Sequence, residues 1–258
     1  MKAENRVSEE KNTGLKTGYR IGAALALILL LLAGMAGSGC VAYETERGSG
    51  NVVKESRSVE PFHSVDLRGT GNVFIEQSGT TGLEIEAEDN ILPLLETSVS
   101  NGVLTIRPVS LINPTKPINL YITMDEVRGL SVSGSGDIKG STPIEAEALE
   151  VGIAGSGDIV LEVNASSVRS RIEGSGDLLL KGRAARHEVE ISGSGNVKAS
   201  ELSTESTIVE ISGSGNAGVL AEQLLDIDIS GSGSVIYSGS PEEFRTEVSG
   251  SGKVERID

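Results

Sequence analysis

Three aspartates recur at nearly constant spacing in the C-terminal half of the chain, and carboxylates in such a row could bind a cation. Asp137, Asp158 and Asp177 are 21 and 19 residues apart, and each directly follows a Gly-Ser-Gly tripeptide. If the repeats stack as neighbouring strands, the carboxylates lie about 5 Å apart along one edge. A row of like charges is costly unless a cation, a proton or solvent relieves it. The row therefore suggests either a weak calcium site or three solvated turn residues.

The later repeats favour solvated turn residues. The same position there holds Asn196, Asn216, Ser234 and Lys253, and a lysine would oppose a bound cation. The repeat is also much longer than the units of about nine residues that bind calcium in β-rolls. We predict no metal site and no cofactor.

The chain offers few other catalytic groups. Its two histidines, His63 and His187, have no neighbouring cysteine or second histidine with which to form a zinc site. The repeated serines lie in Gly-Ser-Gly and not in the Gly-x-Ser-x-Gly elbow of many hydrolases. The glycines do not form a phosphate-binding motif. We therefore predict a non-enzymatic protein without catalytic residues.

One acidic segment leaves an alternative open. Some β-helix proteins cleave polysaccharides, and glycoside hydrolysis uses paired carboxylates. Candidates here are Glu84, Glu86, Glu88 and Asp89, although Glu84 and Glu86 also fit the polar face of a strand. The alternative function is thus a glycan-binding or glycan-active protein of the envelope.

The Gly-Ser-Gly tripeptide itself marks the elements that position these residues. The repeats are 18 to 21 residues apart and begin at Gly134, Gly155, Gly174, Gly193, Gly213, Gly231 and Gly250. A valine or isoleucine lies two residues before each of these glycines, and short segments alternate between apolar and polar residues, as in Val189-Glu190-Ile191. A constant period with a turn signal is typical of stacked strand-and-turn units.

We predict an all-β fold, a single-stranded β-helix or solenoid of about 19–21 residues per coil. The same template fits Gly69-Thr70-Gly71-Asn72 and Gly48-Ser49-Gly50-Asn51. The 65 residues between Gly69 and Gly134 leave room for about three coils with altered turns. We expect one β-helix domain over residues 48–258, with irregular coils in 48–130 and regular coils in 131–258.

Helix signals are few and short. Glu145–Glu150 and Ala221–Leu225 are candidates between strands, and Ile91–Ser98 could form one or two turns. The final unit, Glu247–Asp258, must be capped or paired at its free edge, although Lys253 and Arg256 would discourage pairing.

Residues 1–40 have the pattern of a signal peptide. Basic residues precede an apolar run over 21–36, which is short for a bilayer span. The run ends at Gly37-Ser38-Gly39-Cys40, which is similar to a lipoprotein signal box, so Cys40 is the expected lipid attachment site. Alternatives are an uncleaved anchor and cleavage after Ala36. In each case residues 41–47 form a linker and the domain lies outside the cytoplasm.

Composition narrows the class of partner. The net charge is −15, and residues 1–39 carry five basic and three acidic side chains, so the remainder has a net charge of −17. Such a surface repels nucleic acid and favours cations and basic partners. A single cysteine excludes an intrachain disulfide, so stability must come from coil stacking.

The order of these segments resembles one protein family. Phe62-His63-Ser64-Val65-Asp66-Leu67 leads to Gly69-Thr70-Gly71-Asn72, then to Leu83-Glu84-Ile85-Glu86-Ala87 and the Gly-Ser-Gly repeats. Over about residues 48–258 this is similar to the "putative auto-transporter adhesin, head GIN" domain family. The resemblance implies a right-handed β-helix-like fold outside the cell.

The resulting prediction is a lipid-anchored, non-enzymatic envelope protein that acts in adhesion or envelope interaction. Its expected partners are the membrane, through the lipid, and glycans or other surface proteins. A purely structural or oligomeric envelope protein is the remaining alternative.

Overall fold

Strands dominate the chain, as its alternating apolar and polar residues predict. The computed structural model describes residues 45–257, which belong to one compact unit. Its strands are β1 (Glu46–Arg47), β2 (Val52–Arg57), β3 (Ser64–Gly69), β4 (Asn72–Gln77), β5 (Gly82–Glu88), β6 (Leu95–Ser100), β7 (Val103–Pro108), β8 (Ile112–Asn113), β9 (Asn119–Met124), β10 (Gly129–Gly134), β11 (Asp137–Gly140), β12 (Ile144–Gly155), β13 (Ile159–Gly174), β14 (Asp177–Gly193), β15 (Asn196–Gly213), β16 (Asn216–Gly231), β17 (Ser234–Ser238), β18 (Glu243–Gly250) and β19 (Lys253–Arg256). One 3-10 helix, η1 (Leu92–Leu94), precedes β6.

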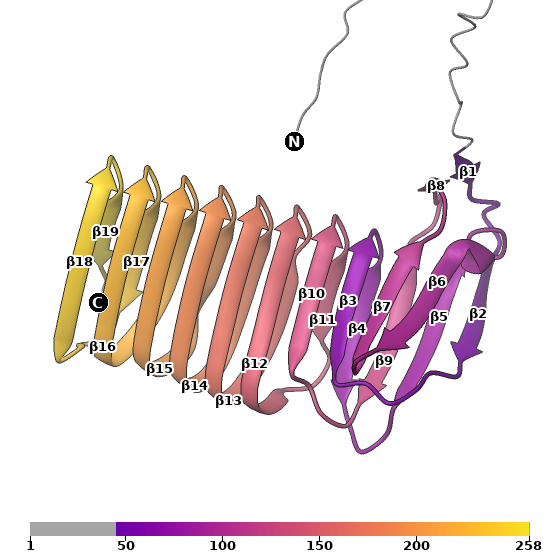
Figure 1. The fold of residues 1–258 in the computed structure, drawn as a ribbon, viewed down its shortest axis with the longest axis horizontal. Coiled ribbons are helices and arrows are strands. Elements are labelled where there is room, and N and C mark those ends of the chain that lie inside the picture. The colour runs from indigo at the N-terminus through magenta and orange to yellow at the C-terminus, as the bar shows by residue number, and fades with distance from the viewer. Residues whose placement is uncertain (1–44, 258) are drawn as a thin grey trace, which may run out of the picture. The chain divides into compact units, whose positions relative to one another are not determined.

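The C-terminal part is a solenoid of parallel strands, which confirms the predicted fold (Figure 1). Strands β12 to β16 each pair in parallel with the next, and one tight turn per coil reverses the chain. The Gly-Ser-Gly turns lie side by side in register, so that the first glycines pair in the order Gly134, Gly155, Gly174, Gly193, Gly213, Gly231 and Gly250.

Columns of aliphatic side chains form the core between the two walls of the solenoid. One column lies two residues before each turn, and both Ile172 and Ile191 in it are 0% exposed. A second column follows the turns and includes Ile159, Leu178 and Val197. Burial of each such side chain contributes about 1.5–3 kcal/mol, so coil stacking replaces the missing disulfides.

The turns bring backbone directly against backbone. Gly193 has a φ of +127°, and a Cβ there would lie 2.5 Å from the carbonyl oxygen of Gly174 in the preceding coil. The amide of Ser194 donates a hydrogen bond to that oxygen over 2.8 Å. Glycine is required because the conformation and the close approach both exclude a side chain.

The coil formed by β3 and β4 continues the stack directly. Gly69 pairs with Gly134, so the template fits Gly69 to Asn72 as predicted. The expectation of about three further coils before Gly134 is wrong. The intervening segment instead adds β7 and β9 to the other side of β3 and β4, and folds β5 and β6 back in antiparallel pairs.

A tight hairpin accounts for part of that difference. Asn101 and Gly102 both have positive φ, at 51° and 75°, which is the geometry of a tight hairpin between β6 and β7. The prediction of a coil at Gly48 to Asn51 is also wrong, because β2 pairs in an antiparallel manner with β5. This end of the solenoid is therefore closed by antiparallel strands (Figure 1).

The helix predictions are wrong except for one short segment. Glu145–Glu150 lies in β12 and Ala221–Leu225 lies in β16, because strands of the neighbouring coil pair with most of their residues. Of Ile91–Ser98, only Leu92–Leu94 is helical, as η1.

The predicted signal segment 1–40, with Cys40, lies outside the described residues. At the end of the expected linker, Glu46–Arg47 forms β1 and pairs with β8. Across residues 45–257, no helix is both long enough and apolar enough to cross a membrane.

Candidate interaction surface

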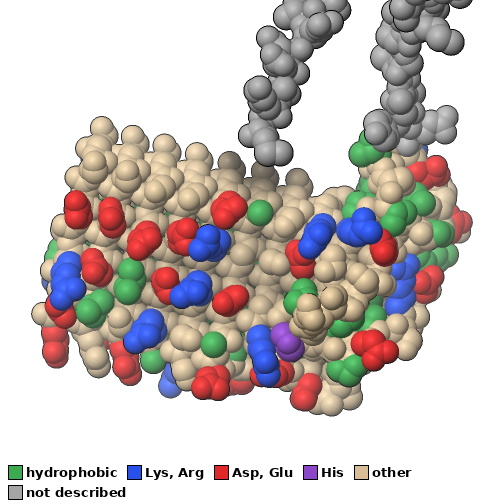
Figure 2. All heavy atoms as spheres, viewed as in Figure 1, with side chains coloured by type: hydrophobic (Ala, Val, Ile, Leu, Met, Phe, Trp, Pro, Cys, Tyr) green, Lys and Arg blue, Asp and Glu red, His purple; other side chains and the backbone are tan. Residues whose placement is uncertain are grey.

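A row of carboxylates follows the outer face of the solenoid, three residues before the first glycine of four consecutive turns. We call it the acidic ladder, and the register places its members side by side on adjacent strands: Glu190, Glu210, Asp228 and Glu247. Neighbouring strands are about 4.8 Å apart, so the carboxylates repeat at that spacing. Figure 2 shows the row running toward the C-terminal end of the face.

Only one end of the acidic ladder is neutralised. Arg171 continues the row and holds Glu190 at 2.6 Å. Within residues 45–257, no lysine or arginine forms an ion pair with Glu210, Asp228 or Glu247, and these three side chains are exposed. The C-terminal half of the face is thus a strip of uncompensated negative charge.

The neighbouring rows differ in character. One row contains both charges, separated by Ile208, with Arg169 at 2.8 Å from Glu188 and Arg245 at 3.9 Å from Asp226. The row nearer the turns carries exposed hydroxyls at Ser192, Ser212, Ser230 and Ser249. The acidic ladder is the part of this flat face with uncompensated charge. Alternation within single strands does not reveal it, because its members lie 18 to 20 residues apart in the sequence.

The aspartates of the turns do lie in a column, and at least one carboxylate oxygen of each accepts a hydrogen bond. The carboxylate of Asp137 accepts the backbone N–H of Asp158 over 3.0 Å, and the carboxylate of Asp158 accepts that of Asp177 over 2.9 Å. Hydrogen bonds from Lys198 and then Asn196 lower the pKa of Asp177. In the described part of the chain, no group of His, Cys, Asp and Glu side chains is arranged to hold a metal ion. The column links coils through hydrogen bonds.

The two histidines are far apart in the sequence and have different surroundings. His187 is 1% exposed, and its Nε2 lies 2.9 Å from the hydroxyl of Ser170, which is 0% exposed. Burial lowers the pKa of His187 to about 4. The Nδ1 atom of His63 lies 3.0 Å from the hydroxyl oxygen of Ser64. The Ser170–His187 pair is sealed inside the core and cannot reach a substrate.

The acids near the middle of the sequence hold the N-terminal part together. Lys54 contacts Glu84 at 2.8 Å and Glu86 at 3.4 Å. Asp89 accepts hydrogen bonds from Asn51 and Ser49, which lower its pKa.

Glu88 is the one acid of this group that is buried. Burial alone would raise its pKa, but hydrogen bonds from Thr115, Gly50 and Lys116 outweigh that effect and lower it. A general acid for glycoside hydrolysis needs a raised pKa. The pKa values of Glu88 and Asp89 are shifted in the opposite direction.

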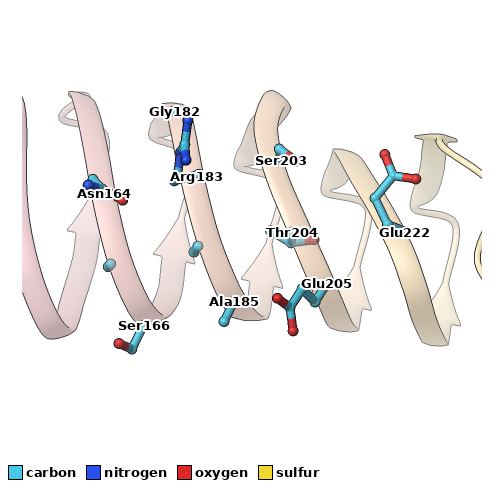
Figure 3. Close-up of a pocket in the computed structure, with 11 residues that line it drawn as sticks. Asn164, Ser166, Gly182, Arg183, Ala185, Ser203, Thr204, Glu205 and Glu222 are labelled. Atoms are coloured by element: carbon cyan, nitrogen blue, oxygen red, sulfur yellow. The ribbon is translucent and has the colours of Figure 1, made fainter.

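A shallow groove of about 450 Å³ crosses the outer side of β13 to β16, away from the turns (Figure 3). Small residues such as Gly182 and Ala185 form its floor, and Arg183, Glu205 and Glu222 supply charge from different coils. Apart from Thr204, its polar side chains are exposed, so it has the character of a surface depression.

Comparison with solved structures finds the same fold elsewhere. A "putative adhesin" from Bacteroides fragilis shares 24% identity, covers 82% of this chain and 99% of its own, and superimposes with a TM-score of 0.77. A "putative lipid binding protein" from Parabacteroides distasonis shares 24% identity, covers 83% and 100%, and has a TM-score of 0.72. At these identities the likeness establishes the fold alone.

The sequence also matches a family model described as "Putative auto-transporter adhesin, head GIN domain" over residues 61–241. A comparison with curated proteins gave no match. The matched region runs from the segment before β3 to the residues that follow β17, so it covers most of the solenoid. This confirms the resemblance noted from the sequence, and the chain belongs to the family of the putative auto-transporter adhesin, head GIN domain.

Proposed function

We propose that this protein is a non-enzymatic lipoprotein of the cell envelope that binds a cationic surface partner through the acidic ladder. The uncompensated strip over Glu210, Asp228 and Glu247 carries the proposal. Carboxylates fixed at the strand spacing on a rigid sheet present several charges at once, so a partner with repeated basic groups can contact them together. Membership of an adhesin family agrees with such a role outside the cytoplasm.

Replacing the three exposed acids by their amides should weaken binding to a cationic partner. The E210Q/D228N/E247Q variant removes three negative charges and keeps the shape of the side chains, so we expect at least a tenfold loss of affinity at low salt. The measurement is a binding screen of the purified protein against envelope glycans, basic polypeptides and whole cells, with and without calcium.

A matched control removes the same charge elsewhere. The E201Q/E205Q/E222Q variant alters exposed acids on the other side of the coils, two of which line the groove. Equal loss of binding in both variants would mean that net charge alone attracts the partner. Loss only in the control would move the site to the groove and favour the alternative of a glycan-binding module.

The lipid anchor has its own test. If Cys40 carries the lipid, cells grown with a labelled fatty acid should label the wild-type protein, and Cys40→Ala should abolish the label. Release of the variant into the soluble fraction is the expected consequence. A variant that stays membrane-bound without label would indicate an uncleaved anchor.

A further inference from the structure

The C-terminal end of the solenoid is open. Among the residues that the structure describes, β18 pairs with β16 alone and β19 pairs with β17 alone. Every residue of β18 is exposed, and no other segment within residues 45–257 covers the strand. Half of its peptide groups face away from β16 and have no partner on that side.

The core is uncovered at the same place. Phe244 and Val248 occupy the inward columns, but they are 43% and 41% exposed, whereas Leu225 and Ile229 one coil earlier are 0% exposed. Phe244 is stacked on Tyr237, with ring centroids 5.2 Å apart. The end therefore combines a free strand edge with apolar side chains, the features that another strand would satisfy.

We propose that a second copy of this chain covers this end, with the two β18 strands antiparallel about a two-fold axis midway between the two copies of Thr246. A two-fold axis normal to the sheet keeps outward side chains on the same face, so one residue of the strand must lie opposite its own copy across the axis. Centred on Thr246, the two copies overlap from Glu243 to Ser249.

This register is complementary to itself. It places Arg245 of each copy opposite Glu247 of the other, and Phe244 opposite Val248. Opposite charges on facing strands stabilise a pair, and the apolar pairs close the core across the interface. Shifting the axis to Arg245 or to Glu247 would instead bring like charges face to face, so the alternatives with substantial overlap are penalised.

The symmetry also has a consequence for the outer face. A rotation about the normal of the sheet leaves both acidic ladders on the same side of the dimer. Glu247 of each copy then faces Arg245 of the other, so Glu210 and Asp228 of both copies carry the charge that remains uncompensated. A closed two-fold contact uses both open ends, so the assembly stops at two copies.

Single charge reversals in β18 should abolish the dimer. In R245E the new glutamate faces Glu247 of the partner, and in E247R two arginines face each other. We expect each variant to dissociate at least about tenfold more readily than the wild type, because symmetry disrupts two pairs at once. Sedimentation of the full chain in detergent over a concentration series measures this change.

Mixing the two variants provides the decisive measurement. An R245E strand opposite an E247R strand restores both opposite-charge pairs, so the mixture should form a heterodimer with wild-type affinity. Arg245 also pairs with Asp226 and Glu243 of its own chain, so thermal melting must show that R245E remains folded. Single variants that dimerise like the wild type, or a mixture of folded monomers, would overturn the proposal.

Cross-linking tests the position of the axis. Opposed residues in an antiparallel pair have Cα atoms about 4.5–5.5 Å apart, within the range of a disulfide. In a Cys40→Ser background, Thr246→Cys should give a covalent dimer, whereas Ser194→Cys in a mid-solenoid turn should not. A wild-type protein that is monomeric throughout, or one that grows into longer assemblies, would exclude the closed dimer.

Discussion

Replacing Gly193 by alanine is expected to destabilise the solenoid by about 4 kcal/mol. The positive φ of Gly193 is unfavourable for any residue with a Cβ, and that atom would lie 2.5 Å from the Gly174 carbonyl oxygen. A backbone carbonyl cannot move aside as a flexible side chain can, so the clash is removed only if the two coils move apart. Because each coil contacts only its neighbours, loss of this one interface weakens the cooperativity of the whole stack.

Urea unfolding followed by circular dichroism measures the effect, and the adjacent residue provides the control. Ser194 is exposed and uses its backbone N–H, which alanine retains, to bond Gly174. Ser194→Ala should therefore unfold at nearly the wild-type midpoint, whereas Gly193→Ala should unfold at a much lower one. Equal midpoints for the two variants would show that the turns tolerate a side chain.

Acidification from pH 6.5 to about 4 should remove about 3 kcal/mol of stability through His187. Burial lowers the folded-state pKa of His187 to about 4, below its ordinary value of 6.5. Below pH 6.5, His187 binds a proton in the unfolded chain but remains neutral in the folded chain. The stabilisation is thus complete above pH 6.5 and is lost as the pH falls toward 4.

His187→Gln isolates this contribution. The amide can still form a hydrogen bond with Ser170 but does not titrate, so the variant should lose the pH dependence between 6.5 and 5. Carboxylates with lowered pKa, such as Asp177, lose their contribution only near pH 4 and below. If the free energy of unfolding of the variant falls as steeply as that of the wild type in this window, another group is responsible.

The position of His187 shows how far the repeat allows prediction. It lies six residues before the first glycine of its turn, where Val168, Thr207 and Leu225 lie in neighbouring coils. All four side chains are buried. Comparison of columns therefore identifies core, ladder and turn positions from the sequence, because parallel stacking brings equivalent residues together.

The same reasoning fails between β4 and β10, where β5 and β6 form antiparallel pairs, although β7 and β9 pair in parallel with β3 and β4. Alternation of apolar and polar residues is identical in both kinds of pairing, so it cannot distinguish a coil from a hairpin. Asn101-Gly102 was the available signal, since this dipeptide favours a tight hairpin. The roles of Glu88 and Asp89 were hidden because they depend on segments far away in the sequence.

The matching register of successive turns also bears on how the chain can change length over evolution. Duplication of one repeat unit in the gene would insert a complete coil whose glycines meet glycines on both sides, as Gly174 meets Gly155 and Gly193. Neither the antiparallel N-terminal strands nor β18 would be altered. Such a fold can lengthen or shorten by whole coils through recombination, and each duplication of a coil that carries Glu190, Glu210 or Asp228 would add one more carboxylate to the face.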